Sequence, residues 1–201
     1  MSPRGFVVLA ALALAGCAGA PRAPEVGARP DPGVLGQWSA SGRMAIAANG
    51  EGGNGSFAWA QDGGTTRLEL RGPLGAGAVR LIVTAESLSL SDGDGRVLDA
   101  EAARADLQAR LGADLPWNHL RYWMLGLPAP GEPASVLDAS ASPWRVIEQS
   151  GWRLTYDSFA DVGGLSLPQR FSAERPSVRV RVIVDRWAPG GASPQATGGA
   201  P

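Results

Sequence analysis

The strictest pattern in this chain is the alternation of valine with other residues in Ser177–Trp187 (SVRVRVIVDRW). Successive side chains of a β-strand point to opposite faces, so a run of this kind buries one face and exposes the other to water. The apolar face carries Val178, Val180, Val182 and Val184, and the other carries Arg179, Arg181 and Asp185. The run therefore predicts a strand with one wet face.

Eight further short runs have a similar strand-like character. They are Trp38–Ala47, Gly55–Gln61, Thr65–Arg71, Ala78–Thr84, Ser87–Ser91, Trp144–Gln149, Trp152–Asp157 and Leu167–Ala173. Turns rich in Gly, Asp and Asn separate many of them, for example Asp62–Gly64 and Ser150–Gly151. Many short strands with close turns are typical of an antiparallel meander with one apolar face. We therefore expect a mainly β fold with few helices.

Two segments break the alternation and predict helices. Ala100–Leu111 follows Asp99, which can cap its first turn, and ends before Gly112. Its apolar stripe is Ala103, Leu107 and Leu111, and Asp106 and Arg110 are spaced for an ion pair. Pro116–Leu125 turns Trp117, Leu120, Trp123 and Met124 to one side. A meander interrupted by two amphipathic helices suggests a curved sheet with a helical lid.

The N-terminal residues have the layout of a secretory signal peptide. Arg4 gives a positive start, and Phe6–Ala15 is an uninterrupted apolar run. Ten helical residues rise about 15 Å, roughly half of a bilayer core, so this run is too short to span a membrane. The run closes on Leu14-Ala15-Gly16-Cys17, which resembles the lipobox of bacterial lipoproteins. We expect cleavage before Cys17 and lipid on its thiol. The alternative is an ordinary signal peptide with an incidental cysteine.

Composition then divides the chain into four parts. Residues 1–16 are the expected signal peptide, and 17–34 form a lipidated cysteine followed by an Ala/Pro/Gly-rich tether. Residues 35–187 are long enough for one domain with a real core. Residues 188–201 are again rich in Pro, Gly and Ala and predict a disordered tail, to which we assign no role.

No catalytic or metal-binding set can be assembled from the sequence. The only histidine, His119, lies on the second predicted helix, where a solvent-facing or interface position fits best, and the only thiol is that of Cys17. The acidic cluster Asp92, Asp94, Asp99 and Glu101 lacks the spacing of a calcium loop and is better explained by a solvated turn and a helix cap. The formal net charge of −1 gives no case for nucleic acid. We expect no enzyme, metal or cofactor.

Apolar and aromatic residues are abundant, with seven tryptophans in the chain. Most stand in or beside the predicted strands, in phase with aliphatic residues. A sheet that curls around a void and one that curls around its own side chains share this binary pattern. The residues alone leave the choice between a filled core and a ligand cavity open.

A series of local motifs, in order, resembles the LolB family of outer-membrane lipoproteins. The matching pieces are Trp38 with Gly42-Arg43, Gly55 to Gln61 (GSFAWAQ), Gly72-Pro73-Leu74-Gly75, Leu115-Pro116 with Leu120 to Gly126 (LRYWMLG), Gln149-Ser150-Gly151-Trp152 with Tyr156, Leu167-Pro168 and Asp185-Arg186-Trp187. With the lipobox, the resemblance extends from Cys17 to Trp187.

The resemblance implies a function. Members of this family accept lipoproteins from the periplasmic carrier LolA and incorporate them into the outer membrane. Their fold is an incomplete antiparallel barrel of about eleven strands, with helices closing a cavity for acyl chains. Ala18, rather than an aspartate, would follow the lipidated cysteine, which implies anchoring in the outer membrane and facing the periplasm. We expect a monomer.

The resemblance also suggests site residues. Leu74, between Pro73 and Gly75, would protrude from a turn and engage the membrane. The acyl-chain cavity would be lined by Phe57, Trp59, Leu68, Leu70, Leu88, Leu90, Leu120, Trp123, Met124 and Trp152. Arg43 matches a family position but receives no role. Two other readings stay open at this point: an envelope lipid-binding or scaffold lipoprotein on the same fold, and a tethered hydrolase, which the missing nucleophile–base pair disfavours.

Overall fold

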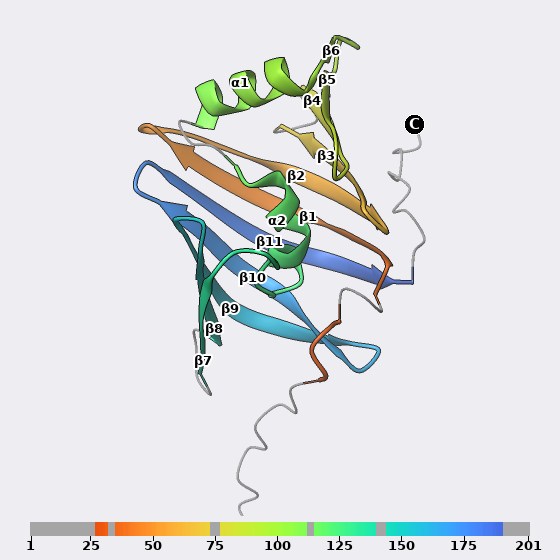
Figure 1. Cartoon of the computed structure of the whole chain (residues 1–201), viewed down its shortest axis with the longest axis vertical. Helices are drawn as coiled ribbons and strands as arrows, with labels where there is room; N and C mark the ends of the chain where they lie inside the picture. The colour runs from red at the N-terminus through yellow and green to blue at the C-terminus, as the bar shows by residue number, and fades with distance from the viewer. Residues whose placement is uncertain (1–26, 32–34, 73–76, 112–114, 140–143, 191–201) are drawn as a thin grey trace, which may run out of the picture.

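A single curved sheet dominates the protein (Figure 1). The computed structural model describes residues 27–31, 35–72, 77–111, 115–139 and 144–190. The strands are β1 (Gln37–Ala48), β2 (Glu51–Asp62), β3 (Thr65–Arg71), β4 (Ala78–Val83), β5 (Leu88–Asp92), β6 (Val97–Leu98), β7 (Ala134–Asp138), β8 (Arg145–Gln149), β9 (Trp152–Val162), β10 (Leu165–Arg175) and β11 (Val178–Pro189). The helices are α1 (Ala100–Leu111) and α2 (Trp117–Met124).

The order of the strands explains why the barrel is incomplete. They run β6-β5-β4-β3-β2-β1-β11-β10-β9-β8-β7, and each neighbouring pair is antiparallel. Only β1 and β11 are neighbours without being consecutive, with Ala48 opposite Val178. In the described part of the chain β6 and β7 do not pair with each other, so the sheet keeps two open edges. The expected unclosed antiparallel barrel is confirmed.

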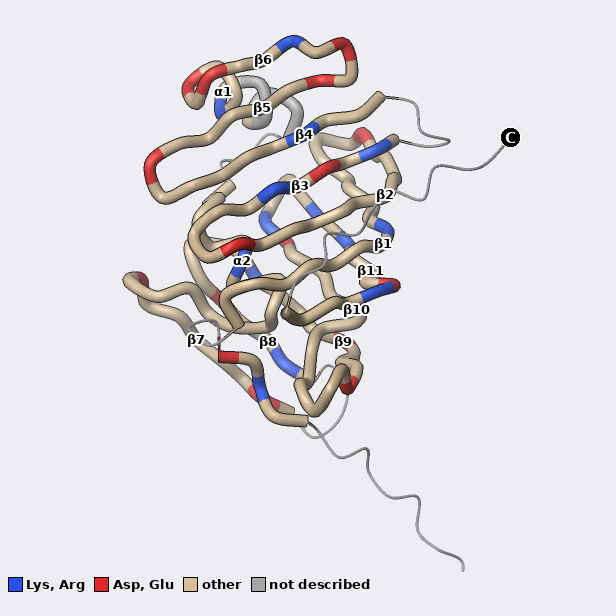
Figure 2. Tube along the Cα trace, turned by 90° about the vertical axis from the view of Figure 1, so that its right-hand side faces the viewer, with Lys and Arg blue, Asp and Glu red and all other residues tan. Residues whose placement is uncertain are grey.

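The two helices connect these edges. After β6 the chain forms α1 beside β5 and β6, and then α2 in front of the middle of the sheet (Figure 1). Figure 2 shows from the side that α2 lies on one face of the sheet. Strands from both halves of the sheet and α2 line one cavity, so this face is the concave one.

Nine of the strands coincide with the nine runs predicted from alternation, and β6 and β7 were missed. β6 is only two residues long. All five residues of β7 are exposed, and its two large apolar residues, Val136 and Leu137, are adjacent rather than alternating. An edge strand with no buried face therefore leaves no period-2 signal. Short edge strands also offer little backbone for pairing with other chains.

Both predicted helices form. The Asp99 carboxylate accepts a hydrogen bond from the backbone N of Ala102 at 2.9 Å, which caps α1 as expected. Ala103 is fully buried. The side chains of Leu107, Leu111 and the expected Asp106–Arg110 pair lie outside the described residues.

The core has two parts. The larger contains Trp38, which stacks on Trp59 with ring centroids 5.6 Å apart and also packs against Trp187. The smaller lies between β4, β5 and α1 and contains Leu81, Val83, Leu88, Leu90 and Ala103. The larger cluster stands at the centre of the sheet.

Candidate functional site

An apolar cavity of about 340 Å³ lies between the concave face of the sheet and α2. This volume is at the lower end of the range of about 300–1,000 Å³ that is usual for ligand pockets. Its lining consists of Met44, Ile46, Phe57, Trp59, Leu68, Leu70, Val79, Leu81, Leu115, Trp117, Leu120, Trp123, Met124, Trp152, Leu154, Phe171, Ala173, Val178, Val180 and Val182. Every lining residue is aliphatic or aromatic or a methionine, so the site suits hydrocarbon.

Strand alternation positions these side chains. Val178, Val180 and Val182 of β11 all face the cavity, so the predicted apolar face is the one turned inward. Arg43 of β1 lies on the opposite, exposed face, where Asp185 of β11 binds it at 2.9 and 3.1 Å. The hydrogen bonds and charge of Asp185 raise the pKa of Arg43. The sheet thus separates an apolar inner face from a charged outer one.

Eight of the ten residues predicted from the resemblance lie in this lining. Leu88 and Leu90 do not, because β5 lies near the edge of the sheet and turns them into the smaller core cluster beside Ala103 of α1. Sequence reasoning also missed lining residues on β1, β4, β9, β10 and β11. The alternation in these strands predicted which residues are buried, but not which of the buried residues line the cavity.

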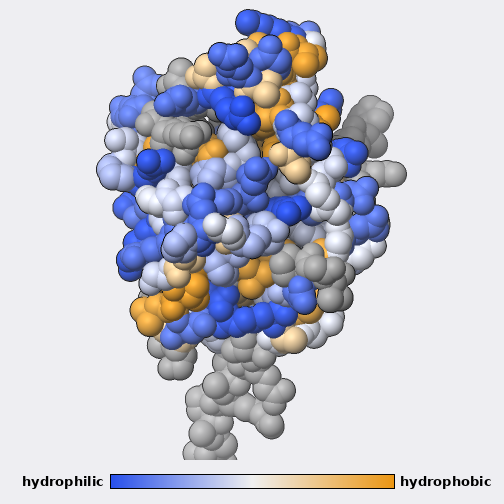
Figure 3. All heavy atoms as spheres, in the orientation of Figure 1, coloured by the Kyte–Doolittle hydropathy of each residue, from blue (hydrophilic) through white to orange (hydrophobic). Residues whose placement is uncertain are grey.

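The predicted lipidation and membrane-loop residues cannot be placed. Cys17 and the Pro73–Leu74–Gly75 turn lie outside the described residues. Figure 3 shows that the face carrying α2 is largely hydrophilic, with apolar atoms gathered at its lower left, over β7, and at its upper right, over β5 and β6. Leu137 of β7 and Val97 of β6 are exposed. Among the described helices, none combines the length and the hydropathy needed to cross a membrane.

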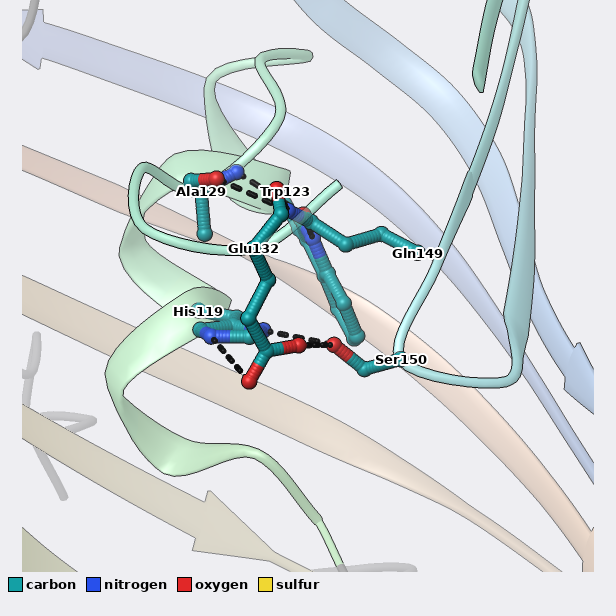
Figure 4. Close-up of polar contacts among 6 residues, drawn as sticks. All are labelled: His119, Trp123, Ala129, Glu132, Gln149 and Ser150. Carbon is teal, nitrogen blue, oxygen red and sulfur yellow. Dashed lines mark hydrogen bonds and ion pairs between the residues drawn. The ribbon is translucent and has the colours of Figure 1, made fainter. Parts of the chain in front are cut away.

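Three buried polar side chains of β8 and β9 hold α2 in place, and we call Arg145, Gln149 and Tyr156 the α2 anchor. Gln149 accepts hydrogen bonds from Trp123 Nε1 at 3.0 Å and from Ala129 N at 2.8 Å (Figure 4). Its amide nitrogen donates to the carbonyl oxygens of Ala129, at 2.7 Å, and of Glu132. One side chain thereby joins α2 and the segment after it to β8.

The other two members of the α2 anchor bind the end of the helix. Tyr156 is fully buried, and its hydroxyl donates to the carbonyl oxygen of Trp123 at 2.7 Å. Burial raises the pKa of this phenol. Arg145 donates to the carbonyl oxygen of Gly126 and pairs with Asp138 at 2.7 Å. Sequence reasoning missed all three, because their partners are distant in sequence.

A polar cluster joins the start of α2 to the β8–β9 turn (Figure 4). Ser150 Oγ donates to Glu132 Oε2 at 2.6 Å and lies 3.1 Å from His119 Nδ1. His119 is mostly buried rather than solvent-facing. Because the Ser150 proton is given to Glu132, His119 Nδ1 must donate to Ser150 and cannot act as its base. The structure brings a serine and a histidine together, but in a bracing arrangement.

A polar groove of about 520 Å³ adjoins the apolar cavity, and the two share Leu115 and Trp117. Its polar lining includes Glu86, Arg104, Asn118, His119, Glu132, Ser150 and Arg175. No group of acidic, histidine or cysteine side chains in the described ranges could hold a metal ion. Because the cavity is apolar and the adjoining groove is polar, a ligand with an apolar chain in the cavity and a polar end in the groove would match both surfaces.

The fold and the cavity define a class: an open antiparallel half-barrel that encloses an apolar ligand site beneath a helix. The family model described as "Outer membrane lipoprotein LolB" matches residues 36–187. The chain belongs to this family of outer-membrane lipoproteins.

Curated relatives agree with this assignment. The outer-membrane lipoprotein LolB of Marinomonas sp. is 32% identical over 93% of this chain and 98% of its own length. That of Halorhodospira halophila is 37% identical over 93% of this chain and 96% of its own length. That of Pseudomonas aeruginosa is 36% identical over 77% of this chain and 76% of its own length.

Proposed function

We propose that this protein accepts lipoproteins from the periplasmic carrier LolA, holds their acyl chains in the cavity beneath α2, and incorporates them into the outer membrane. The observation that carries the proposal is the all-apolar lining of that cavity in a chain of the LolB family. Twenty side chains line it, and none is charged. The cavity therefore suits hydrocarbon and offers no charged group that a polar substrate could bind.

The size of the transfer problem explains why a cavity is needed. A lipoprotein with three acyl chains exposes on the order of forty methylenes, and burial is worth about 0.8 kcal/mol for each. Passage through water would therefore cost roughly 30 kcal/mol. Apolar walls remove this cost without directional bonds, so the cargo can leave again. Handover then proceeds downhill if each acceptor binds the cargo better than the last.

The proposal is tested by filling the cavity. Ala173 lines it and is only half-buried, whereas Ala45 lies on the exposed face of β1. Replacing Ala173 with Phe should occupy the space for acyl chains and greatly reduce transfer of cargo from loaded LolA, measured with purified components. Ala45→Phe adds the same ring on the outer face and should transfer normally.

Equal transfer by both variants would contradict the proposal. Binding of an acyl probe without any transfer from LolA would instead indicate an envelope lipid-binding or scaffold protein.

The anchoring of the chain is part of the same proposal: lipid on Cys17 would hold the domain at the inner leaflet of the outer membrane, with residues 18–34 as the tether.

Delivery is expected to depend on Leu74. Burying one leucine in lipid is worth about 1.5–3 kcal/mol, and a charge at its tip resists desolvation. Leu74→Glu should still take cargo from LolA but incorporate it poorly into membranes, whereas Leu74→Ile should remain active. If the folded glutamate variant fails in uptake as well, Leu74 belongs to the cavity instead of the membrane-engaging loop.

A further inference from the structure

Three polar side chains of the groove have no partner in the described part of the chain. Glu86 in the β4–β5 turn, Arg104 of α1 and Asn118 in the first turn of α2 all line the groove. All three residues are exposed, and no described residue forms a hydrogen bond or ion pair with their side chains. By contrast, Glu132 of the same groove is bound by Ser150. The groove therefore presents donors and acceptors that the described protein does not use.

These side chains lie next to the apolar cavity. Leu115 and Trp117 line both the cavity and the groove, and Asn118 follows them at the start of α2. Because the cavity offers hydrogen-bonding groups no partner, the polar part of an acylated ligand is expected to lie outside it. In a lipoprotein, the group joined to the acyl chains is the first residue of a peptide. The groove is thus placed to receive the start of that peptide.

We propose that the polar groove binds the first peptide residues of the cargo, next to its acylated end, and that the Asn118 side chain hydrogen-bonds to their backbone. This inference rests on the proposed function, because it requires acyl chains in the cavity. The amide of asparagine has both an acceptor oxygen and donor N–H groups, which match the N–H and C=O groups of a peptide. From other elements, Glu86 adds an acceptor and Arg104 adds donors.

The charges of the groove favour a peptide over a lipid phosphate. A phosphate is typically bound where arginine or lysine side chains gather, and arginine can bind its oxygens in pairs. Here Arg104 and Arg175 are matched by Glu86 and Glu132, so the lining does not concentrate positive charge. A peptide backbone is neutral and carries donors and acceptors in alternation. Because backbone atoms are the same in every cargo, such binding would hold lipoproteins of different sequence.

The test compares two probes that carry the same lipid. One is tripalmitoyl-S-glycerylcysteine methyl ester, and the other is the same lipid extended by a short uncharged peptide of serine and glycine. Their displacement of an apolar-sensing dye is measured with the full chain in lipid nanodiscs, for the unsubstituted protein and for Asn118→Ala. One neutral hydrogen bond is worth a factor of about three to ten in affinity. Asn118→Ala should weaken the lipopeptide by about this factor and leave the methyl ester unchanged.

Asn54→Ala is the matched control. Asn54 is an exposed asparagine of β2 and does not line the groove, so its replacement should leave both probes unchanged. A third probe, a lipopeptide with N-methylated peptide bonds, has lost its N–H donors. The effect of Asn118→Ala should be smaller for this probe, because fewer hydrogen bonds are left to remove. An effect that acts only through the packing of α2 would be the same for both lipopeptides.

The outcomes separate the two proposals. If Asn118→Ala weakens the methyl ester as much as the lipopeptide, or weakens neither, the groove does not bind the peptide and the inference is overturned, while binding of acyl chains stands. The same selective loss in Asn54→Ala would overturn it too. If neither probe displaces the dye from the unsubstituted protein, the cavity does not accept acyl chains, and the proposed function fails together with the inference.

Discussion

Helix α2 meets the two halves of the sheet in different ways. On the β8–β9 side it is held by the α2 anchor, whose three residues are buried and bind backbone and side-chain atoms of α2 and of the segment that follows it. On the β2–β3 side the corresponding polar contact is an exposed bond of 3.3 Å from the half-buried Arg121 to the carbonyl oxygen of Gly63. Apolar contacts around the cavity make up the rest.

This difference shows how one fold can hold α2 in a fixed position and still keep an apolar site that adapts to a ligand. Directional bonds set where α2 lies relative to β8 and β9, and they are costly to break when buried. Apolar contacts on the other side tolerate a change of partner, so hydrocarbon of a ligand can replace hydrocarbon of the wall. The helix is therefore positioned from one side and offers its other side to the ligand.

The largest effect is expected from removing Gln149. Gln149→Ala leaves Trp123 Nε1 and the backbone groups of Ala129 and Glu132 without their partner. Each buried group that loses its partner costs about 1–3 kcal/mol, so we expect a loss of about 3–5 kcal/mol in the free energy of unfolding. Denaturant titration measures it. Gln37→Ala removes an exposed bond to Asp62 and should change little, and equal effects of both would refute the α2 anchor.

A smaller loss of stability is expected where two strands at the centre of the sheet approach most closely. A Cβ atom built on Gly42 would stand 2.1 Å from the carbonyl oxygen of Ile183 and 2.9 Å from Phe57. Backbone cannot give way as a flexible side chain does, so Gly42→Ala should cost about 2–3 kcal/mol. A Cβ atom built on Gly53, in the neighbouring strand β2, would meet no other atom within 4 Å. Gly53→Ala should be neutral, and a harmless Gly42→Ala would show that β1 can shift.

Tyr156→Phe tests the α2 anchor at its other end. The Trp123 carbonyl oxygen would keep its bond from Gly126 N, so the loss should be only about 1 kcal/mol. The pH dependence of the free energy of unfolding distinguishes this variant more clearly. Because folding raises the pKa of Tyr156, only the unfolded chain releases this proton above pH about 10. Stability should then fall by up to about 1.4 kcal/mol per pH unit, and Tyr156→Phe should remove this loss in alkaline unfolding curves.

The smallest effect is expected from Arg43, whose exposed pair with Asp185 can be compared with the buried pair of Arg145 and Asp138. The Arg43 side chain is 64% exposed and that of Arg145 is 7% exposed. Exposed ion pairs add little to stability because water solvates the separated charges well. Arg43→Ala should leave the denaturant midpoint unchanged, whereas Arg145→Ala should lower it clearly. A shift of equal size in both variants would show that burial does not distinguish the two pairs.

The fold was predictable where one face of an element is buried. The alternation of β11 and the capping by Asp99 each determine a local conformation without help from the rest of the chain. β7 was not predictable, because its side chains are all exposed and only pairing with β8 makes it a strand.

For the site, the apolar character could be predicted from the sequence, but the set of residues that line the cavity could not. Phe57, Trp59 and Leu68 could be assigned to an apolar face, and they do line the cavity. Leu88 and Leu90 carry the same pattern on a strand that packs against α1. Which apolar residues surround space depends on the curvature of the whole sheet, and sequence does not express that locally. The role of Gln149 depends on partners that are distant in sequence and meet it only in three dimensions.

The pairing of β1 with β11 has a consequence for how the protein folds. The first and last strands are neighbours at the centre of the sheet, with Trp38 opposite Pro189 at one end of their ladder. Each half of the sheet can form from contacts between strands near in sequence, but the seam between the halves must wait for the final residues of the domain. Contacts so distant in sequence slow folding, because a long loop has to close before they form. A nascent chain of this protein therefore stays without its central pairing until it is complete.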